Sequence, residues 1–237
     1  LCAKGRYAVD FGASADRVTQ PMLREHGAWR TVTWDEALCF LRDRITAMRA
    51  HHGVRSLAVL GSSRCTNEEN YLAQKFARVV LGNHNVDCCA RVCHTPTAAA
   101  MKLMLGAGAA TNSYDDIELA RTILVCGANP TENHPVIGAR VKRAARNGAR
   151  LIVIDPRRTE LADMATLHVA PQPGGNIPLL NAMASVIVRE QWIDEAFVRA
   201  RVAEFDAFRD FIAAWTPEFA SPLCGVPQEV ISEAARL

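Results

Sequence analysis

The chain has 237 residues, 49% of them hydrophobic, and its 27 Lys and Arg residues nearly balance 25 Asp and Glu, which gives a formal net charge of +2 at pH 7. This length and apolar content predict one large or two modest domains with a full hydrophobic core. The near-neutral charge gives no indication of nucleic-acid binding, and no apolar run approaches the ~20 residues that a membrane-spanning helix needs, so we expect neither a nucleic-acid partner nor a direct membrane span.

Residues 1–30 are rich in Gly, Arg and Pro and show little periodicity, which predicts irregular or short hairpin structure. Thr33, followed by Glu36, has the pattern of a capping box and predicts a helix that ends near Gly53. A second helix is predicted over residues 67–80. The remaining predicted helices span residues 97–105, 114–119, 135–146, 177–189, 195–201, 205–215 and 227–237.

Short apolar runs alternate with these helices and predict buried strands. They span residues 56–60, 122–126, 151–154 and 168–170. A repeated strand–loop–helix order predicts an α/β fold with Rossmann-like layers, in which helices cover both faces of a parallel sheet. Ligands of such folds bind where polar loops follow the carboxyl ends of the strands.

Residues 85–94 combine unusual chemistry in one short segment, Asn-Val-Asp-Cys-Cys-Ala-Arg-Val-Cys-His. An alanine-rich stretch follows, so we expect Cys93 and His94 to lie at or near a helix N-terminus, whose positive field favours a thiolate. Three interpretations are open: a zinc cluster, buried small cysteines with one surface histidine, and a single metal-binding or nucleophilic Cys93. Zinc is disfavoured because Cys88 and Cys89 are adjacent and no second pair with zinc-like spacing follows.

Two loops that follow predicted strands suit an anionic, nucleotide-like ligand. The first offers Gly127 for close backbone approach, with Asn129 and Glu132 before a helix, and the second offers Asp155 and Arg157. A carboxylate can accept two guanine N–H groups together, and pyrophosphate suits arginine and helix N-termini. The second loop is equally compatible with a plain turn that carries solvated charge. Neither a dinucleotide glycine fingerprint nor a Gly-Lys-Ser/Thr phosphate loop is present, which argues against NAD and ATP sites in this chain.

Taken together, these segments resemble the catalytic (alpha) subunit of molybdenum- or tungsten-dependent formate dehydrogenases, in the molybdopterin oxidoreductase superfamily. The most specific match is the segment 85–94, where that family carries a selenocysteine or cysteine metal ligand followed by histidine. The resemblance implies that Cys93 binds the metal and that His94 accepts a proton or stabilises developing charge. It also implies that Cys88 and Cys89 are packing residues. The histidine separates formate dehydrogenases from nitrate reductases of the same fold.

The cofactor implied by the resemblance is Mo- or W-bis(molybdopterin guanine dinucleotide), at which formate is oxidised to CO₂ or the reverse. Residues 61–71 resemble a cofactor loop of the family, which assigns Arg64 and Asn67 to cofactor binding. The other residues that the resemblance assigns to the cofactor are Gly127, Asn129, Glu132, Asp155, Arg157, Gly175 and Asn176.

The segment Cys2-Ala3-Lys4-Gly5 resembles the end of the family's iron–sulfur motif. By itself it is equally compatible with a surface lysine beside a terminal cysteine. The resemblance implies that Cys2 is one of four ligands of a [4Fe–4S] cluster, and that Lys4 lies on the electron path between cluster and pterin. The other three cluster cysteines, and the arginine that the family uses to bind formate, are not in this chain.

We therefore expect a fragment that is inactive by itself. Residues 1–30 are expected to be a remnant of an iron–sulfur domain, and residues 31–87 part of a first α/β domain. Residues 88–237 are expected to form a second, cofactor-binding α/β domain that is incomplete at its C-terminal end. The expected partners are formate and CO₂, iron–sulfur or diaphorase-type electron-transfer subunits, and the remainder of the catalytic subunit.

Two alternatives stay open. One is another molybdopterin oxidoreductase, such as a nitrate reductase type, and the other is a non-catalytic α/β subunit of such a complex. The eight cysteines are too sparse for a disulfide scaffold, so we expect most to be buried thiols in a reducing, cytoplasmic compartment. No signal peptide is present, but the chain starts at Leu1 instead of Met, and the missing N-terminus leaves a periplasmic location open.

Overall fold

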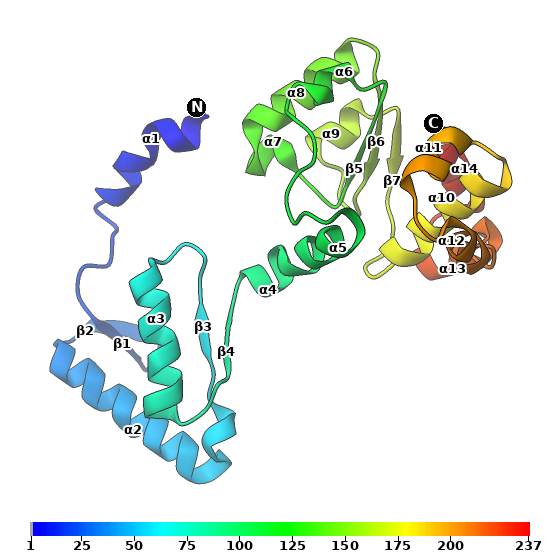
Figure 1. Ribbon diagram of the computed structural model, residues 1–237. Helices are drawn as coiled ribbons and strands as arrows, with labels where there is room; N and C mark the ends of the chain where they lie inside the picture. The colour runs from blue at the N-terminus through cyan, green and yellow to red at the C-terminus, as the bar shows by residue number, and fades with distance from the viewer. Residues whose placement is uncertain (1) are drawn as a thin grey trace. The chain divides into compact units, whose positions relative to one another are not determined.

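Two compact units make up the protein, one of residues 6–111 and the other of residues 112–237 together with the N-terminal residues up to Gly5. The computed structural model describes residues 2–237 (Figure 1). The predicted domain 1–30 therefore begins at a residue, Leu1, that lies outside the described part of the chain. The domain limits predicted after residues 30 and 87 stay predictions.

Residues 3–12, expected to be irregular, form helix α1 (Ala3–Gly12). No residue of this helix is buried, and neither an acidic first turn nor a basic last turn marks its ends in the sequence. The expected hairpin does form further along, where β1 (Met22–Glu25) pairs antiparallel with β2 (Ala28–Thr31).

In the unit of residues 6–111, side-chain caps determine where two of the helices begin. Thr33 accepts the backbone N–H of Glu36 and starts α2 (Trp34–His52), as the capping-box pattern predicts. Thr66 and Glu69 form a full capping box at α3 (Asn67–Lys75). A π-helical segment continues α3 over residues 76–81 and ends at Gly82, whose φ of 71° is left-handed.

Strands β3 (Val59–Gly61) and β4 (Val86–Cys88) form a two-stranded parallel sheet. The strand predicted over residues 56–60 is displaced toward Gly61, because Val54–Ser56 forms a 3₁₀ turn. It is also not buried, since Leu60 is 83% exposed. After β4 come α4 (Ala90–Cys93) and α5 (Thr95–Leu105).

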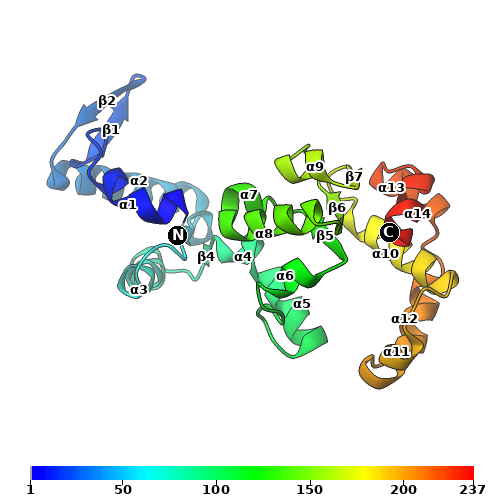
Figure 2. The same cartoon turned by 90° about the horizontal axis from the view of Figure 1, so that it is seen from above.

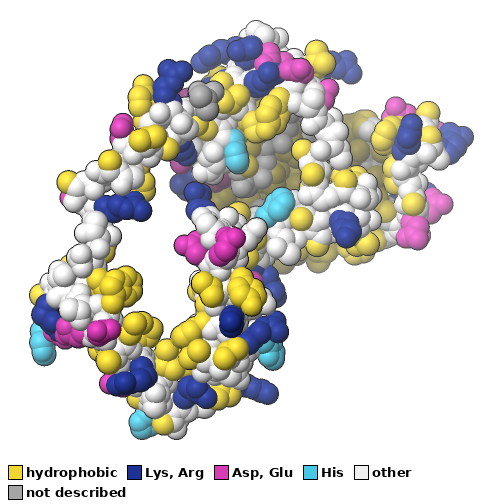
Figure 3. Space-filling model, turned by 60° about the vertical axis from the view of Figure 1, so that its left-hand side comes forward, with side chains coloured by type: hydrophobic (Ala, Val, Ile, Leu, Met, Phe, Trp, Pro, Cys, Tyr) yellow, Lys and Arg dark blue, Asp and Glu magenta, His cyan; other side chains and the backbone are white. Residues whose placement is uncertain are grey.

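The unit of residues 6–111 buries few apolar side chains. Its buried hydrophobic residues are Val32, Ala77 and Leu81. Large hydrophobic side chains lie instead on its surface among charged ones (Figure 3). Those on α2 and α3 include Trp34, Leu38, Phe40, Leu41, Tyr71 and Leu72. The full core expected from composition therefore does not form in this unit.

The other unit is built on a three-stranded parallel sheet of order β5–β6–β7. Its strands are β5 (Thr122–Cys126), β6 (Arg150–Ile154) and β7 (Leu167–Val169). The central strand β6 is buried from Leu151 to Ile154. Successive side chains of a strand point to opposite faces, and a buried parallel strand is therefore apolar on both sides.

Helices cover both faces of this sheet, as the sequence predicts. Leu151 and Val153 pack with α8 (Pro135–Arg146) and α9 (Glu160–Met164) on one face. Ile152 and Ile154 pack on the other face with helices that gather beside β7 (Figures 1 and 2). These are α10 (Asn176–Arg189), α13 (Pro217–Cys224) and α14 (Gln228–Arg236).

The remaining helices of this unit are short. They are α6 (Asp116–Leu119), α7 (Pro130–Asn133), α11 (Glu195–Arg201) and α12 (Phe205–Ile212). The α/β architecture with parallel strands is thus as predicted, although these strands form two small sheets, β3–β4 and β5–β6–β7, instead of one. No helix in residues 2–237 is both long and apolar enough to span a bilayer.

Replacing Ile154 by Ala tests the buried sheet. Ile154 is 1% exposed, so we expect the free energy of unfolding to fall by about 2–5 kcal/mol through lost burial and a residual cavity. Urea unfolding of the 237-residue chain measures this loss. The matched control Leu124→Ala, at a site on β5 that is 47% exposed, should cost much less. Equal losses in the two variants would contradict the packing described here.

Candidate functional site

Cys93 and His94 lie at the junction of two helices. Cys93 is the last residue of α4, His94 is the N-cap of α5, and both side chains are exposed. The N–H of Cys93 donates to the carbonyl oxygen of Cys89 at 3.2 Å, and the carbonyl oxygen of His94 accepts the N–H of Ala98 at 2.9 Å. The thiol thus precedes the N-terminus of an 11-residue helix by two positions, as expected from the sequence.

Cys89 is not the packing residue that the sequence suggested. Its thiol is exposed, and Ser63 contacts the sulfur twice, through Oγ at 3.1 Å and through its backbone N–H at 3.4 Å. Ser62 Oγ lies 3.9 Å away. These hydrogen bonds, that of the Ser63 hydroxyl first, lower the pKa of Cys89 to about 7. Cys88 is half-buried.

All eight cysteines are free thiols, but the expectation that most are buried is wrong. Only Cys224 is buried, where it packs in the core beside the sheet. Cys39, Cys65, Cys93 and Cys126 are exposed, like Cys89. For Cys39, Cys65, Cys89 and Cys93 the reason is the sparse core of residues 6–111, whereas Cys126 is the last residue of β5 in the other unit.

The polar loop after β3 carries Arg64 and, at the start of α3, Asn67, and both side chains are exposed. The backbone N–H of Arg64 donates to Ser62 Oγ at 3.2 Å, which shapes the loop. Asn70 donates from Nδ2 to the carbonyl oxygen of Ser62 at 3.0 Å. The loop borders a groove of about 330 Å³ that Gly61, Ser62, Ser63, Asn70 and Cys88 help to line.

In the other unit, the parallel pairing brings the residues after β5, β6 and β7 to one edge of the sheet. The N–H of Gly127 donates to Ile154 O at 2.8 Å, and the N–H of Asp155 donates to Val169 O at 3.1 Å. Gly127 has a φ of 60°, and no atom lies within 4 Å of where its Cβ would be. An open backbone of this kind permits the close approach that the sequence predicts.

Several predicted binding residues at this edge have structural partners. Asp155 is 9% exposed, and its Oδ1 accepts the N–H of Arg157 at 2.8 Å. Asn129 is 8% exposed and accepts the Thr131 hydroxyl at 2.7 Å. A Cβ at Gly175 would lie 2.8 Å from the Cα of Cys224, so packing against α13 already requires glycine there.

The groups left accessible at this edge are those that suit phosphate. Arg157 and Asn176 are exposed, and α10, which begins at Asn176, has no side-chain cap at Gly175. Uncapped N–H groups at a helix N-terminus and a free guanidinium both bind phosphate oxygens. The chemistry of these donors suits the phosphate groups of a nucleotide-containing cofactor. In the unit of residues 6–111, the exposed Cys93 thiol is of the ligand type that soft metals prefer.

Residues 2–237 do not supply a complete ligand set for an iron–sulfur cluster, so Cys2 could contribute only one ligand. Cys2 is half-buried, and the backbone N–H of Gly5, followed by that of Lys4, holds the pKa of its thiol below the usual value. Such a cluster takes four thiolates, and residues 2–237 contain no group of three or more His, Cys, Asp or Glu side chains arranged to hold a metal ion. Lys4 donates from Nζ to the carbonyl oxygen of Glu132 at 2.6 Å.

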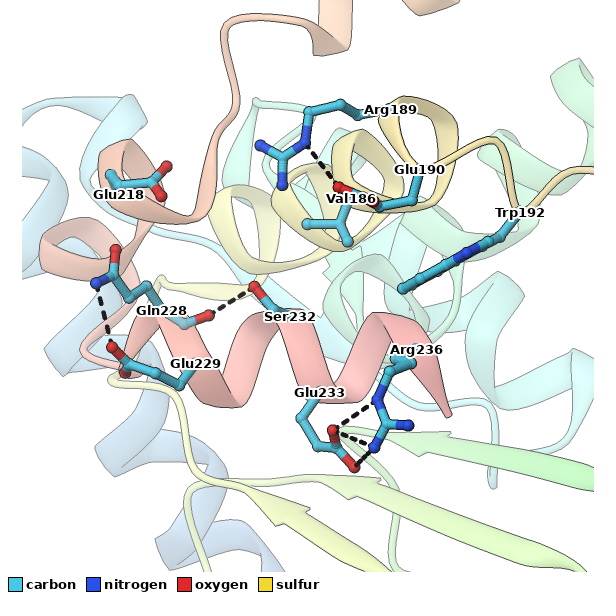
Figure 4. A pocket seen from close by; sticks show the side chains of 10 residues that line it. All are labelled: Val186, Arg189, Glu190, Trp192, Glu218, Gln228, Glu229, Ser232, Glu233 and Arg236. Atoms are coloured by element: carbon cyan, nitrogen blue, oxygen red, sulfur yellow. Dashed lines mark hydrogen bonds and ion pairs between the residues drawn. The ribbon is translucent and has the colours of Figure 1, made fainter.

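A separate groove of about 450 Å³ lies between α10, α13 and α14 (Figure 4). Both arginines of the groove are paired within its wall, since Arg189 bonds Glu190 at 3.2 Å and Arg236 bonds Glu233 at 2.6 Å. The pKa of Glu218 is lowered by its own backbone N–H first, then by the Thr216 hydroxyl and the charge of Arg189. This groove is lined by none of the residues that the sequence predicts to be catalytic or to bind a cofactor or metal.

A family model for molybdopterin oxidoreductases matches residues 17–234. The chain belongs to the molybdopterin oxidoreductase family. It is 43% identical over 237 residues to the F420-dependent formate dehydrogenase subunit alpha of Methanocaldococcus jannaschii, and 42% identical over 244 aligned positions to formate dehydrogenase H of Escherichia coli. All of this chain is aligned in both cases, but only 34% of each relative, so the chain spans about a third of their length.

Among solved structures, acetylene hydratase from Pelobacter acetylenicus is similar to this molybdopterin oxidoreductase chain, with a TM-score of 0.64 and 25% sequence identity. The likeness covers 99% of this chain and 32% of the hydratase. It supports the α/β fold class that the sequence predicts.

The acidity of Cys89 can be tested by thiol alkylation. Because the thiolate is the nucleophile, the iodoacetamide reaction of Cys89 in the 237-residue chain should reach half of its maximal rate near pH 7. Mass spectrometry of the Cys89 peptide measures this rate. Ser63→Ala removes the main stabilising hydroxyl and should move the midpoint upward. A midpoint that is the same in both proteins would contradict the assigned cause.

Proposed function

We propose that this chain is the cofactor-binding part of a formate dehydrogenase catalytic subunit that binds Mo- or W-bis(molybdopterin guanine dinucleotide), with Cys93 as the protein ligand of the metal. The proposal is carried by one observation, the exposed Cys93–His94 pair at the junction of α4 and α5. It is supported by the 43% identity to a formate dehydrogenase alpha subunit along the whole chain.

When bound, the cofactor supplies the two-electron redox chemistry that interconverts formate and CO₂. Cys93 contributes a thiolate, a ligand that soft metals prefer, and its exposure leaves the sulfur accessible. His94, the next residue, offers an imidazole that can take the proton released from formate. Arg64 and Arg157, both exposed, offer guanidinium groups to phosphate oxygens.

The proposed assembly extends beyond this chain. Cys2 is proposed as one ligand of a [4Fe–4S] cluster whose other ligands come from outside residues 1–237, and Lys4 as a residue between cluster and pterin. The expected protein partners are the remainder of the catalytic subunit and iron–sulfur or diaphorase-type electron-transfer subunits. This chain by itself is not expected to turn over formate.

Cys93→Ser in the full-length enzyme tests the ligand. We expect formate oxidation to fall by more than about a hundredfold, because loss of a residue that only hydrogen-bonds to a metal ligand already costs up to about that factor. Pterin content should largely survive. Formate-dependent dye reduction and pterin analysis measure the two quantities. Cys39→Ser, at an exposed site on α2, is the control that should retain activity. Unchanged activity in Cys93→Ser would refute the proposed role.

His94→Ala tests the proton acceptor. We expect a drop in kcat of about a hundredfold or more, as is usual for loss of an acid–base group, with metal content retained. His84→Ala, at another exposed histidine of the same unit, should have little effect. Comparable rates for the two variants would show that His94 does not take part in proton transfer.

Two other functions are separated from this proposal by direct assays. A nitrate reductase type would reduce nitrate and leave formate unchanged, so a formate-versus-nitrate assay on the intact protein distinguishes them. A non-catalytic α/β subunit would contain neither molybdenum, tungsten nor pterin after purification, although it would remain folded.

A further inference from the structure

Cys89 lies at the point where the parallel sheet of residues 6–111 leads into the helix that bears Cys93. The last pair of the sheet is Gly61 with Cys88, and Cys89 is the residue that follows β4. Its sulfur lies 3.1 Å from Ser63 Oγ and 3.4 Å from Ser63 N. The Cys89 side chain, just after β4, is thus hydrogen-bonded to the loop that follows the neighbouring strand β3.

The loop that binds Cys89 is itself held by α3. Asn70 Nδ2 donates to the carbonyl oxygens of Ser62 at 3.0 Å and Thr66 at 3.2 Å. A Cβ at Gly61 would lie 2.9 Å from Asn70 Oδ1, which shows how closely the amide approaches the loop. The serine that contacts the Cys89 sulfur therefore belongs to a loop fixed at both ends.

From Cys89 the connection to Cys93 is a single helical turn. The Cys93 N–H donates to the Cys89 carbonyl oxygen at 3.2 Å, and α4 has only four residues and no side-chain cap at its start. An Arg91–Asp87 ion pair at 3.5 Å also spans this turn, but both side chains are well exposed, and such pairs contribute little. The contacts of the Cys89 sulfur are therefore the side-chain restraint that ties this turn to the loop after β3.

We propose that Cys89 is a positioning residue for Cys93, with its sulfur held by Ser63 so that the α4 turn presents the Cys93 thiol in one fixed place. This inference rests on the proposed function of Cys93 as metal ligand. The loop after β3 then has two tasks: it offers Arg64 to the cofactor, and it fixes the ligand-bearing turn. Misplacement of a reacting group by as little as ~1 Å can cost a rate factor of about a hundred.

The experiment compares Cys89→Ala, Cys89→Ser and Ser63→Ala in the full-length holoenzyme, with Cys39→Ala as a matched exposed-cysteine control on α2. We expect Cys89→Ala to lower kcat for formate roughly tenfold or more, with KM, metal content and melting temperature close to wild type. A hydroxyl can make the same hydrogen bonds, so Cys89→Ser should recover most of the rate. The electron paramagnetic resonance signal of the metal should shift in Cys89→Ala and return in Cys89→Ser.

The double variant Ser63→Ala/Cys89→Ala adds a test of coupling. Because both substitutions remove the same contact, the combined loss should be smaller than the product of the single losses. Wild-type kcat and spectrum in Cys89→Ala would overturn the inference, and so would a Cys89→Ser variant as impaired as Cys89→Ala. Cys93→Ser in the same series separates the two proposals: if it is inactive while Cys89→Ala is normal, only the positioning role fails, and if it is fully active, the metal-ligand role fails.

Discussion

Parallel hydrogen bonding between neighbouring strands is the constraint on which the rest of this molecule depends. In a parallel sheet the carboxyl ends of all strands meet at one edge, so residues distant in sequence are brought together there. Pairing of Gly61 with Cys88 places Ser63 beside Cys89. Pairing among β5, β6 and β7 likewise aligns Gly127 and Asp155 at an edge of the other sheet.

The two units differ in how many buried hydrophobic side chains support their parallel sheets. In the unit with β6, helices bury both faces of the sheet, and the loops at its edge are fixed by a core. The unit with Cys93 buries only three hydrophobic side chains. There, hydrogen bonds from Asn70 and Ser63, and the caps at Thr33 and Thr66, hold the local structure. Small changes in polar side chains should therefore matter more there than in the β6 unit.

Much of the secondary structure could be predicted from the spacing of apolar residues and from the residues that mark the ends of helices and strands. Strand 122–126 and helix 135–146 have the predicted limits, because apolar runs and flanking Gly or Pro are local signals. Helix 195–201 also has the predicted limits, and Asp194 caps its start. Helix α1 was missed because its first turn has no acidic residue and its last turn no basic one, so the usual charge signals of helix ends are lacking. Helix α13 was missed because Pro222 lies inside it, where proline usually ends a helix.

The candidate site could be predicted only in part, for a related reason. The unusual composition of residues 85–94 draws attention to Cys93 and His94 from the sequence alone. Both side chains are exposed in the structure. The environment of Cys89 depends on a serine 26 residues away, which no local pattern reveals. Conversely, Gly175 looked like a ligand contact, although packing against Cys224 already explains it.

The central claim, that Cys93 binds the metal of a pterin cofactor, is tested most directly by X-ray absorption at the molybdenum or tungsten edge of the full-length protein. Wild type should show sulfur scattering beyond that of the pterin dithiolenes, and Cys93→Ser should lose one sulfur neighbour and gain a lighter one. Cys88→Ser should leave the spectrum unchanged. Identical sulfur coordination in wild type and Cys93→Ser would contradict the account.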